Sequence, residues 1–382
     1  MRNGDRHRPR DGALGISSDD AKYAHKQARS AIGRSLQGKI AAWSKRTVRI
    51  PIPWSNWYGI ARSTLALSPL LTLMCTRPEN LFFPTEGMNQ AVHCDGLSRY
   101  GLFCLDHGDH LDLLRWISIL TLILVASGWR PRITCIPHWY VAISFFTNCV
   151  IPEGGDQISA IMALLLIPAC LSDPRRWHWV AMASTDGDRK QSTVAKLSTT
   201  AGAIAIGVAK LQVSWVYLQS GISKLSHDVW IDGTAMYYWF RHAYFGAPGW
   251  SRPVLLSLSS QPVTEAVITW SPIALEVTLG VSLLLPRRLK VKFLLPAGIT
   301  FHFLIGLSMG LWSFAFAMWG ALIILLIPAG SQIQSAHITR RLRGVLNRAK
   351  PQSHDKDKAQ HVENIDRGRD TSRRTDEHVT AC

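Results

Sequence analysis

The chain has 382 residues, of which 47% are hydrophobic and 18% charged, and 42 Lys and Arg against 26 Asp and Glu give a formal net charge of +16. This composition excludes a disordered polymer, a collagen-like repeat and a small disulfide-rich domain. The 23 Lys and Arg of residues 1–57 and 331–382 leave only 19 for the segment between them. The sequence therefore predicts three parts: a basic N-terminal tail (1–57), an apolar block (58–330) and a basic, disordered C-terminal tail (331–382).

Hydrophobic runs repeat through the apolar block between short polar gaps. A bilayer core of roughly 30 Å is spanned by about 20 mostly apolar helical residues. We therefore expect an all-α fold, a polytopic transmembrane helix bundle of about eight spans. The predicted spans are 59–75, 112–128, 135–151, 157–172, 197–221, 266–285, 292–308 and 311–329.

The charges in the gaps give an independent test of this topology, because cytoplasmic gaps are richer in Lys and Arg. Every second gap is basic, whereas acidic residues outnumber the two arginines of the first outer gap, 76–111. The basic residues of the predicted inner gaps are Arg130, Arg132, Arg175, Arg176, Arg189, Lys190, Arg287, Arg288, Lys290 and Lys292. This pattern predicts a multi-pass protein of the bacterial cell membrane with both termini in the cytoplasm.

The seven cysteines occur singly, with no CxxC pair, so the sequence predicts no zinc or redox motif and no metal site. Cys94 and Cys104 fall together in the first outer gap. They are interpreted either as a disulfide, which the outside of the cell permits, or as two free thiols.

Polar side chains inside the apolar runs are the candidates for function, since a charge inside a span is costly. Lys210, Tyr217 and Lys224 follow one another at spacings of seven, which places them on one helix face. We expect this face to point into the bundle. The alternatives are a structural partner to a carboxylate for Lys210 and a lysine that reaches the membrane surface for Lys224.

Glu276 and His302 interrupt two other runs, and with the lysines they are predicted to converge on one buried polar site or on a hydrogen-bond network without chemistry. Asp156 and Gln157 belong to an outer turn, 153–157, which is typical of a helix cap. The aromatic-rich stretch 227–250 is typical of a membrane-interface belt and, second, of a surface that faces substrate. Its candidate functional residues are Trp230, Gly233 and Tyr237.

The segment 217–225, followed by Trp230, Gly233 and Tyr237, resembles the HTTM superfamily, whose membrane fold is shared with vitamin K-dependent γ-carboxylases. Phe301 and His302, followed by a glycine and an aromatic run, give a second match. The resemblance implies that Lys224 is the catalytic base, with His302 and Glu276 as further catalytic residues. It also implies a reduced quinone, such as vitamin K, as cofactor. The resemblance does not extend to the large extramembrane domain of the carboxylases, so we do not expect that domain here.

Within that superfamily the sequence resembles the sporulation-delaying protein B (SdpB) family, over roughly residues 55–330. The motifs that carry this resemblance are 152–157, 164–168, 173–179 and 230–239. It implies that the protein assists production or maturation of a secreted SdpC-like antimicrobial toxin peptide. The implied partners are the precursor toxin peptide, a small SdpA-like protein and the lipid bilayer.

Two other functions remain open at this point. One is a quinone-dependent carboxylase-like membrane enzyme, and the other is a non-enzymatic transporter or immunity protein that uses Lys210, Glu276 and His302 as a polar pathway. Nucleic-acid binding by the basic tails is not predicted, since they hold few aromatic residues and no binding motif. The sequence leaves open whether the protein is an enzyme.

Overall fold

The computed structural model describes residues 52–84, 92–106, 109–180 and 192–333. Across these ranges the regular structure is helical, and the one pairing of β type is an isolated bridge between Trp129 and Trp177. The predicted all-α class is confirmed for this part of the chain. The predicted tails 1–57 and 331–382 fall almost entirely outside the described residues.

All eight predicted spans correspond to helical segments. The helices of these segments are α2 (Asn56–Cys75), α4 (Leu111–Ala126), α5 (Pro131–Asn148), α6 (Gly154–Leu165), α7 (Ile167–Ser172), α8 (Thr193–Lys224), α12 (Pro262–Gly280), α14 (Leu295–Met309) and α15 (Trp312–Leu326). The predicted span 157–172 is divided between α6 and α7, because Pro168 in the first turn of α7 lacks the N–H that would continue the helix. The short helices are α3 (Pro78–Leu81), α9 (Asp228–Ile231), α10 (Ala235–Trp239), α11 (Arg252–Leu258) and α13 (Arg287–Leu289).

Two helices are long and apolar enough to cross a membrane: Thr193–Lys224, and the continuous helix Arg287–Met309 that includes α13 and α14. Trp312–Leu326 is apolar but shorter. The remaining helices do not meet the same test, so the count of eight spans stays a prediction.

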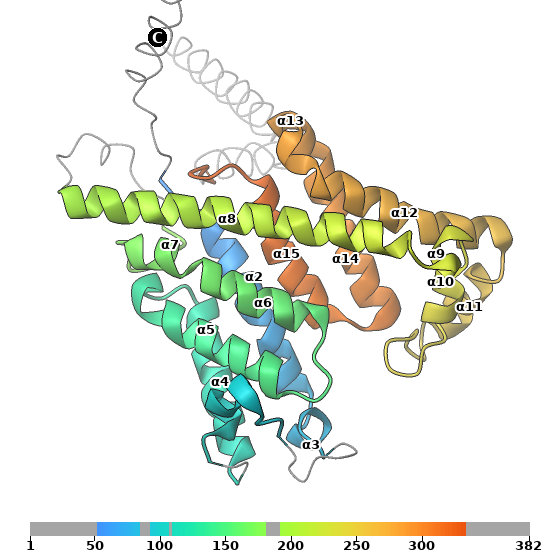
Figure 1. Cartoon of the computed structure of the whole chain (residues 1–382), viewed down its shortest axis with the longest axis horizontal. Helices are drawn as coiled ribbons and strands as arrows, with labels where there is room; N and C mark the ends of the chain where they lie inside the picture. The colour runs from blue at the N-terminus through green and yellow to red at the C-terminus, as the bar shows by residue number, and fades with distance from the viewer. Residues whose placement is uncertain (1–51, 85–91, 107–108, 181–191, 334–382) are drawn as a thin grey trace, which may run out of the picture. The chain divides into compact units, whose positions relative to one another are not determined.

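The core is built around α15, which packs against α2, α6, α8 and α14 (Figure 1). The contact of α15 with α2 is close, because a Cβ on Gly320 would lie 2.8 Å from the carbonyl oxygen of Ala61. A second apolar cluster joins α2, α4 and α5 to the loop segment 92–104. Cys94 and Cys104 in that segment form a disulfide, which decides between the two interpretations of these cysteines.

Buried polar contacts fix the loop after α7 against the start of α2. Asp173 and Arg175 form an ion pair with 2.7 Å between Oδ2 and Nη2, and both side chains are buried. The Arg175 guanidinium also donates to the carbonyl oxygens of His178 and Val180. Burial, with Arg62 and Arg175 nearby, lowers the pKa of His178 to about 3, so this ring is neutral. The motif 173–179 therefore has a structural role.

We expect Arg175→Ala to lower the free energy of unfolding by about 3–5 kcal/mol, because removal of one partner leaves Asp173 buried and unpaired. Thermal unfolding of the purified protein in detergent measures the change. Arg176→Ala is the matched control, since this neighbouring side chain is exposed. Equal effects of the two substitutions would contradict a structural role for the buried pair.

Candidate functional site

The central feature of the site is an ion pair between α8 and α12. Lys224, the last residue of α8, places Nζ 2.5 Å from Oε2 of Glu276. The ammonium also donates to Oγ of Ser220 at 2.8 Å and lies 5.3 Å from the centre of the Trp230 ring. The side chains of Lys224 and Glu276 are 18% and 9% exposed, so both charges are largely removed from water. At the carboxyl end of α8, the helix dipole also favours a cation.

Two glycines allow α8 and α12 to approach closely enough for this pair. A Cβ on Gly221 would lie 2.8 Å from Cγ2 of Val277, and one on Gly280 would lie 2.8 Å from Cα of Leu218. Ser214, one turn before Leu218, donates a hydrogen bond to the carbonyl oxygen of Gly280. The small residues of both helices therefore set the spacing at which Lys224 meets Glu276.

A second polar pair joins α8 to α14. Oη of Tyr217 lies 2.8 Å from Nε2 of His302, and both residues are buried. The other ring nitrogen of His302, Nδ1, is buried and has no hydrogen-bond partner within the described ranges. Phe314 of α15 contacts the same ring edge-on, with 5.4 Å between ring centres.

The two pairs meet at one cavity of about 490 Å³, which we call the polar cavity. Five helices line it: α6, α8, α12, α14 and α15. Its polar lining residues are Gln157, Gln212, Tyr217, Gln219, Ser220, Ser223, Glu276 and His302. Of the residues predicted to converge, Glu276 and His302 line the cavity, Lys224 contacts it through Glu276, and Lys210 does not belong to it.

Asp156 lies beside this cavity and does not line it. The side chains of Glu153 and Asp156 form a capping box at the start of α6, in which Oδ2 of Asp156 accepts from the Glu153 N–H at 3.1 Å. Glu153 also accepts a hydrogen bond from Ser313 at the start of α15, and burial raises the pKa of Glu153. Gly155 packs against the Phe314 backbone, where a Cβ would come within 2.7 Å of Cα. The predicted cap is confirmed, and it fixes the wall that carries Phe314.

Lys210 lies outside the site, although the seven-residue spacing places it on the same side of α8. Its Nζ donates to the carbonyl oxygens of Leu325 and Ile327, at 3.1 and 2.7 Å. These carbonyls are at the end of α15, where no further helical N–H is available to them. The partner of Lys210 is therefore the end of a helix. The alternative interpretation of this residue predicted a carboxylate partner instead.

The aromatic stretch contributes to the site through Trp230, whose ring faces Lys224. Gly233 has a φ of +73°, which an L side chain rarely adopts, and lies against Ala266 and Trp270 of α12. Tyr237 is half-exposed, and its ring lies 3.5 Å from the Arg241 guanidinium carbon. Gly233 and Tyr237 therefore shape the segment that follows Lys224 and do not line the polar cavity.

Sequence reasoning missed Glu265, a buried residue that fixes the aromatic segment. Its Oε1 accepts the N–H of Tyr237 at 2.7 Å, so α12 supplies the cap for the first turn of α10. Glu265 lies one residue before the predicted span 266–285, so the search for charges inside spans did not include it. Pro262 at the start of the helix was a signal that α12 begins earlier than predicted.

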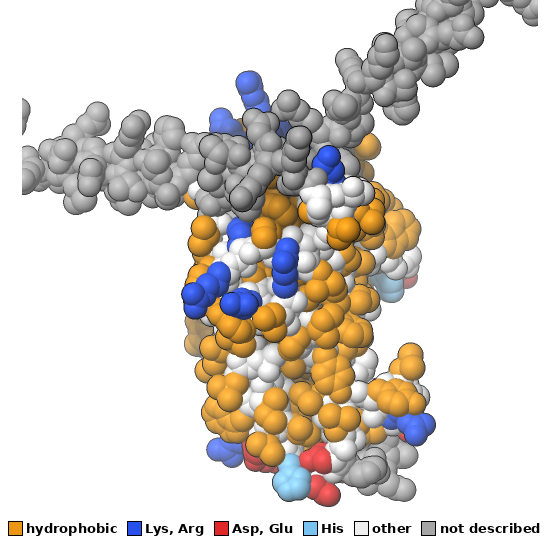
Figure 2. All heavy atoms as spheres, turned by 90° about the vertical axis from the view of Figure 1, so that its left-hand side faces the viewer, with side chains coloured by type: hydrophobic (Ala, Val, Ile, Leu, Met, Phe, Trp, Pro, Cys, Tyr) orange, Lys and Arg blue, Asp and Glu red, His pale blue; other side chains and the backbone are white. Residues whose placement is uncertain are grey.

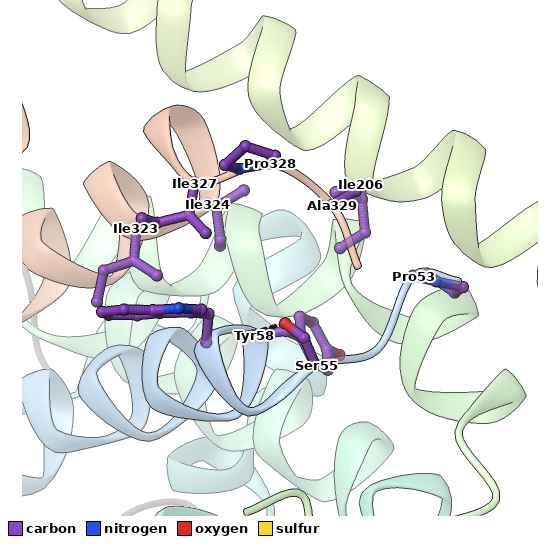
Figure 3. Close-up of a pocket in the computed structure, with 10 residues that line it drawn as sticks. Pro53, Ser55, Tyr58, Ile206, Ile323, Ile324, Ile327, Pro328 and Ala329 are labelled. Atoms are coloured by element: carbon purple, nitrogen blue, oxygen red, sulfur yellow. Dashed lines mark hydrogen bonds between the residues drawn. The ribbon is translucent and has the colours of Figure 1, made fainter. Parts of the chain in front are cut away.

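A small hollow lies between the start of α2, α8 and the end of α15 (Figure 3). Tyr58, Ile206 and Ile327 are among its lining residues. Its volume of about 20 Å³ holds about one water molecule, so it is too small for a substrate. The polar cavity is the better candidate.

Comparison with known proteins identifies the family. The HTTM domain matches residues 163–329. The sporulation-delaying protein SdpB of Bacillus subtilis (strain 168) is 33% identical over 305 residues, 78% of this chain and 87% of that protein. The chain belongs to the SdpB family. The uncharacterized protein YitO of the same bacterium is 34% identical over 310 residues, 81% of this chain and 95% of that protein. No solved structure matches the chain significantly.

The HTTM match begins near the end of α6, and so the polar cavity of this SdpB-family protein combines two regions. Lys224, Glu276 and His302 lie inside the matched residues, whereas Gln157 and the turn before it precede them. Within the described part of the chain, no group of three or more His, Cys, Asp or Glu side chains is placed to hold a metal ion. The cavity residues that fit an organic ligand are hydrogen-bonding amides, hydroxyls and the Lys224–Glu276 pair.

We expect the substitutions Lys224→Met and Glu276→Leu to be strongly coupled. Each alone leaves one buried charge without a partner and lowers the free energy of unfolding by about 3–5 kcal/mol, whereas the double variant leaves no charge and is more stable than either. Thermal unfolding in detergent measures the coupling. Lys196→Met, an exposed change on the same helix, is the control. Additive losses in the double variant would show that the two charges do not stabilise each other.

Proposed function

We propose that this protein is an integral membrane protein that assists production or maturation of a secreted SdpC-like toxin peptide. The observation that carries the proposal is the identity of 33% with the sporulation-delaying protein SdpB, extending over 87% of that protein. The proposed partners are the precursor peptide and a small SdpA-like protein. The HTTM match and the two long apolar helices are consistent with a membrane location.

Exposed apolar side chains support the membrane disposition. Monomeric soluble proteins rarely expose large contiguous apolar patches. Figure 2 shows a broad apolar band on one face, with most of the visible Lys and Arg in its upper half and most of the visible Asp and Glu at its lower end. Large exposed apolar side chains occur on α4, α8 and α12, among them Leu113, Trp116, Leu120, Ile204, Leu211, Trp215, Val263 and Trp270. We propose eight spans with both termini in the cytoplasm.

Reporter fusions test this topology. Alkaline phosphatase, which is active only outside the cytoplasm, is expected to be active after residue 155 and after residue 245, and inactive after residues 130, 190 and 286. Fusions to a fluorescent protein that matures only in the cytoplasm give the complementary pattern and serve as the control. Activity that does not alternate between these positions would contradict the eight-span arrangement.

The polar cavity is the proposed working site, because Glu276 of the ion pair and the Tyr217–His302 pair line it. A second candidate function, a quinone-dependent carboxylase-like enzyme, is favoured by one observation: the lysine that matches the carboxylase base is paired with Glu276, which lines this cavity. In the ion pair with Glu276, however, the Lys224 ammonium donates hydrogen bonds and has no lone pair with which to accept a proton. Base chemistry would require this pair to open first.

Gene deletion and complementation test the proposed function. We expect deletion in the native host to abolish mature peptide in the medium, measured by mass spectrometry, and the wild-type gene to restore it. The double variant Lys224→Met/Glu276→Leu is expected to accumulate in the membrane without restoring the peptide, while Lys196→Met restores it fully. Unchanged peptide after deletion would refute the function. If the double variant restored the peptide level, the ion pair would not be required for this function.

A further inference from the structure

A second cavity, of about 450 Å³, lies next to the polar cavity, and we call it the apolar cavity. The aromatic stretch covers it with Met236, Phe240 and Trp250, and Val254 of α11 also lies on its lining. The described residues that line it include no charged side chain. This cavity suits an uncharged, apolar group that is removed from water.

The two cavities adjoin between α12 and α14, and we refer to them together as the cleft. Phe301 and Ile305, one turn apart on α14, line both cavities. On α12, Pro272 lines the apolar cavity and Glu276, one turn later, lines the polar cavity. A ligand that occupies the cleft therefore meets an apolar pocket at one end and hydrogen-bonding groups at the other.

The charge balance of the cleft selects an uncharged ligand. Glu276 is the one Asp, Glu, Lys or Arg among the described residues that line the two cavities, and Lys224 neutralises it at 2.5 Å. A phospholipid headgroup carries a phosphate and would need a cation that is not already paired. A charged ligand would thus either remain uncompensated or disrupt the ion pair.

The polar wall matches amide groups. Gln157, Gln212 and Gln219 line the polar cavity, and their side-chain amides have no hydrogen-bond partner among the described residues. Each offers both a donor and an acceptor. Gln212 and Gln219 are seven residues apart on α8, a rise of about 10.5 Å, which an extended peptide covers with about three residues. A hydroquinone has its hydroxyl groups on a single ring and reaches fewer of these amides at once.

We infer that the cleft binds an uncharged, extended peptide segment, with main-chain amides along Gln157, Gln212 and Gln219 and an apolar side chain in the apolar cavity. This inference rests on the proposed function and names its substrate class. It requires no particular sequence at the amide positions, because main-chain groups are the same in every residue. Selectivity comes from the apolar cavity and from the absence of a free charge.

Direct binding of a synthetic probe tests this inference. The full-length protein, purified in detergent, is dialysed against radiolabelled N-acetyl-Leu-Leu-Leu-amide, which is uncharged at every position. We expect saturable binding, weakened about fivefold to tenfold by each of Gln212→Leu and Gln219→Leu through the loss of about one hydrogen bond. Gln261→Leu, at an exposed glutamine outside the cleft, is the matched control and leaves binding unchanged.

The apolar cavity is tested separately. Ser271→Trp fills it and is expected to abolish binding of the tri-leucine probe, whereas Ser257→Trp, on the exposed face of α11, does not. Equal binding by all variants, or displacement of the probe by equimolar menadiol or phosphatidylglycerol, would overturn the inference. The assay needs no toxin peptide, so its failure is distinct from the genetic result that would refute the proposed function.

Discussion

The close crossing of α8 and α12 is the constraint on which the site depends. Gly221 and Gly280 contribute no side chain where the two backbones meet, and this brings the end of α8 to the last turns of α12. Lys224 and Glu276 then face each other in surroundings that exclude most water. Neither charge is tolerable there alone, and so the ion pair and the helix crossing stabilise each other. A larger residue at either glycine would separate the helices and the charges together.

The wall of the polar cavity opposite this crossing is held by contacts at both ends of α15. Lys210 of α8 caps the carboxyl end through two backbone carbonyls. Glu153, at the start of α6, accepts a hydrogen bond from Ser313 at the amino end. Phe314 is thereby fixed against His302. Lys210, Glu153 and Asp156 are therefore best understood as positioning residues, because they set the shape of the cavity without lining it.

The positions of the helices were easier to predict from the sequence than the contact partners of the charged residues. Apolar runs mark helical segments wherever a helix is buried or faces lipid, and the spacing of Tyr217 and Lys224 fixes a common face through the regular turn of the helix. The partner of a charged residue, in contrast, is decided by tertiary packing. Lys210 binds backbone carbonyls, which carry no sequence signal, and Glu265 caps a helix 28 residues earlier in the chain.

A balanced ion pair beside the polar cavity also determines which ligands are rejected. A basic group on a ligand would compete with Lys224 for Glu276, and an acidic group would compete with Glu276 for Lys224. Either exchange leaves one protein charge without its partner in surroundings largely closed to water, which is more costly than forgoing a neutral hydrogen bond. Discrimination against charged segments therefore follows from the pair itself and requires no steric barrier. Conversely, chemistry at Lys224 would need a ligand that protonates or displaces Glu276, so binding at the cleft and release of the lysine would be one coupled event.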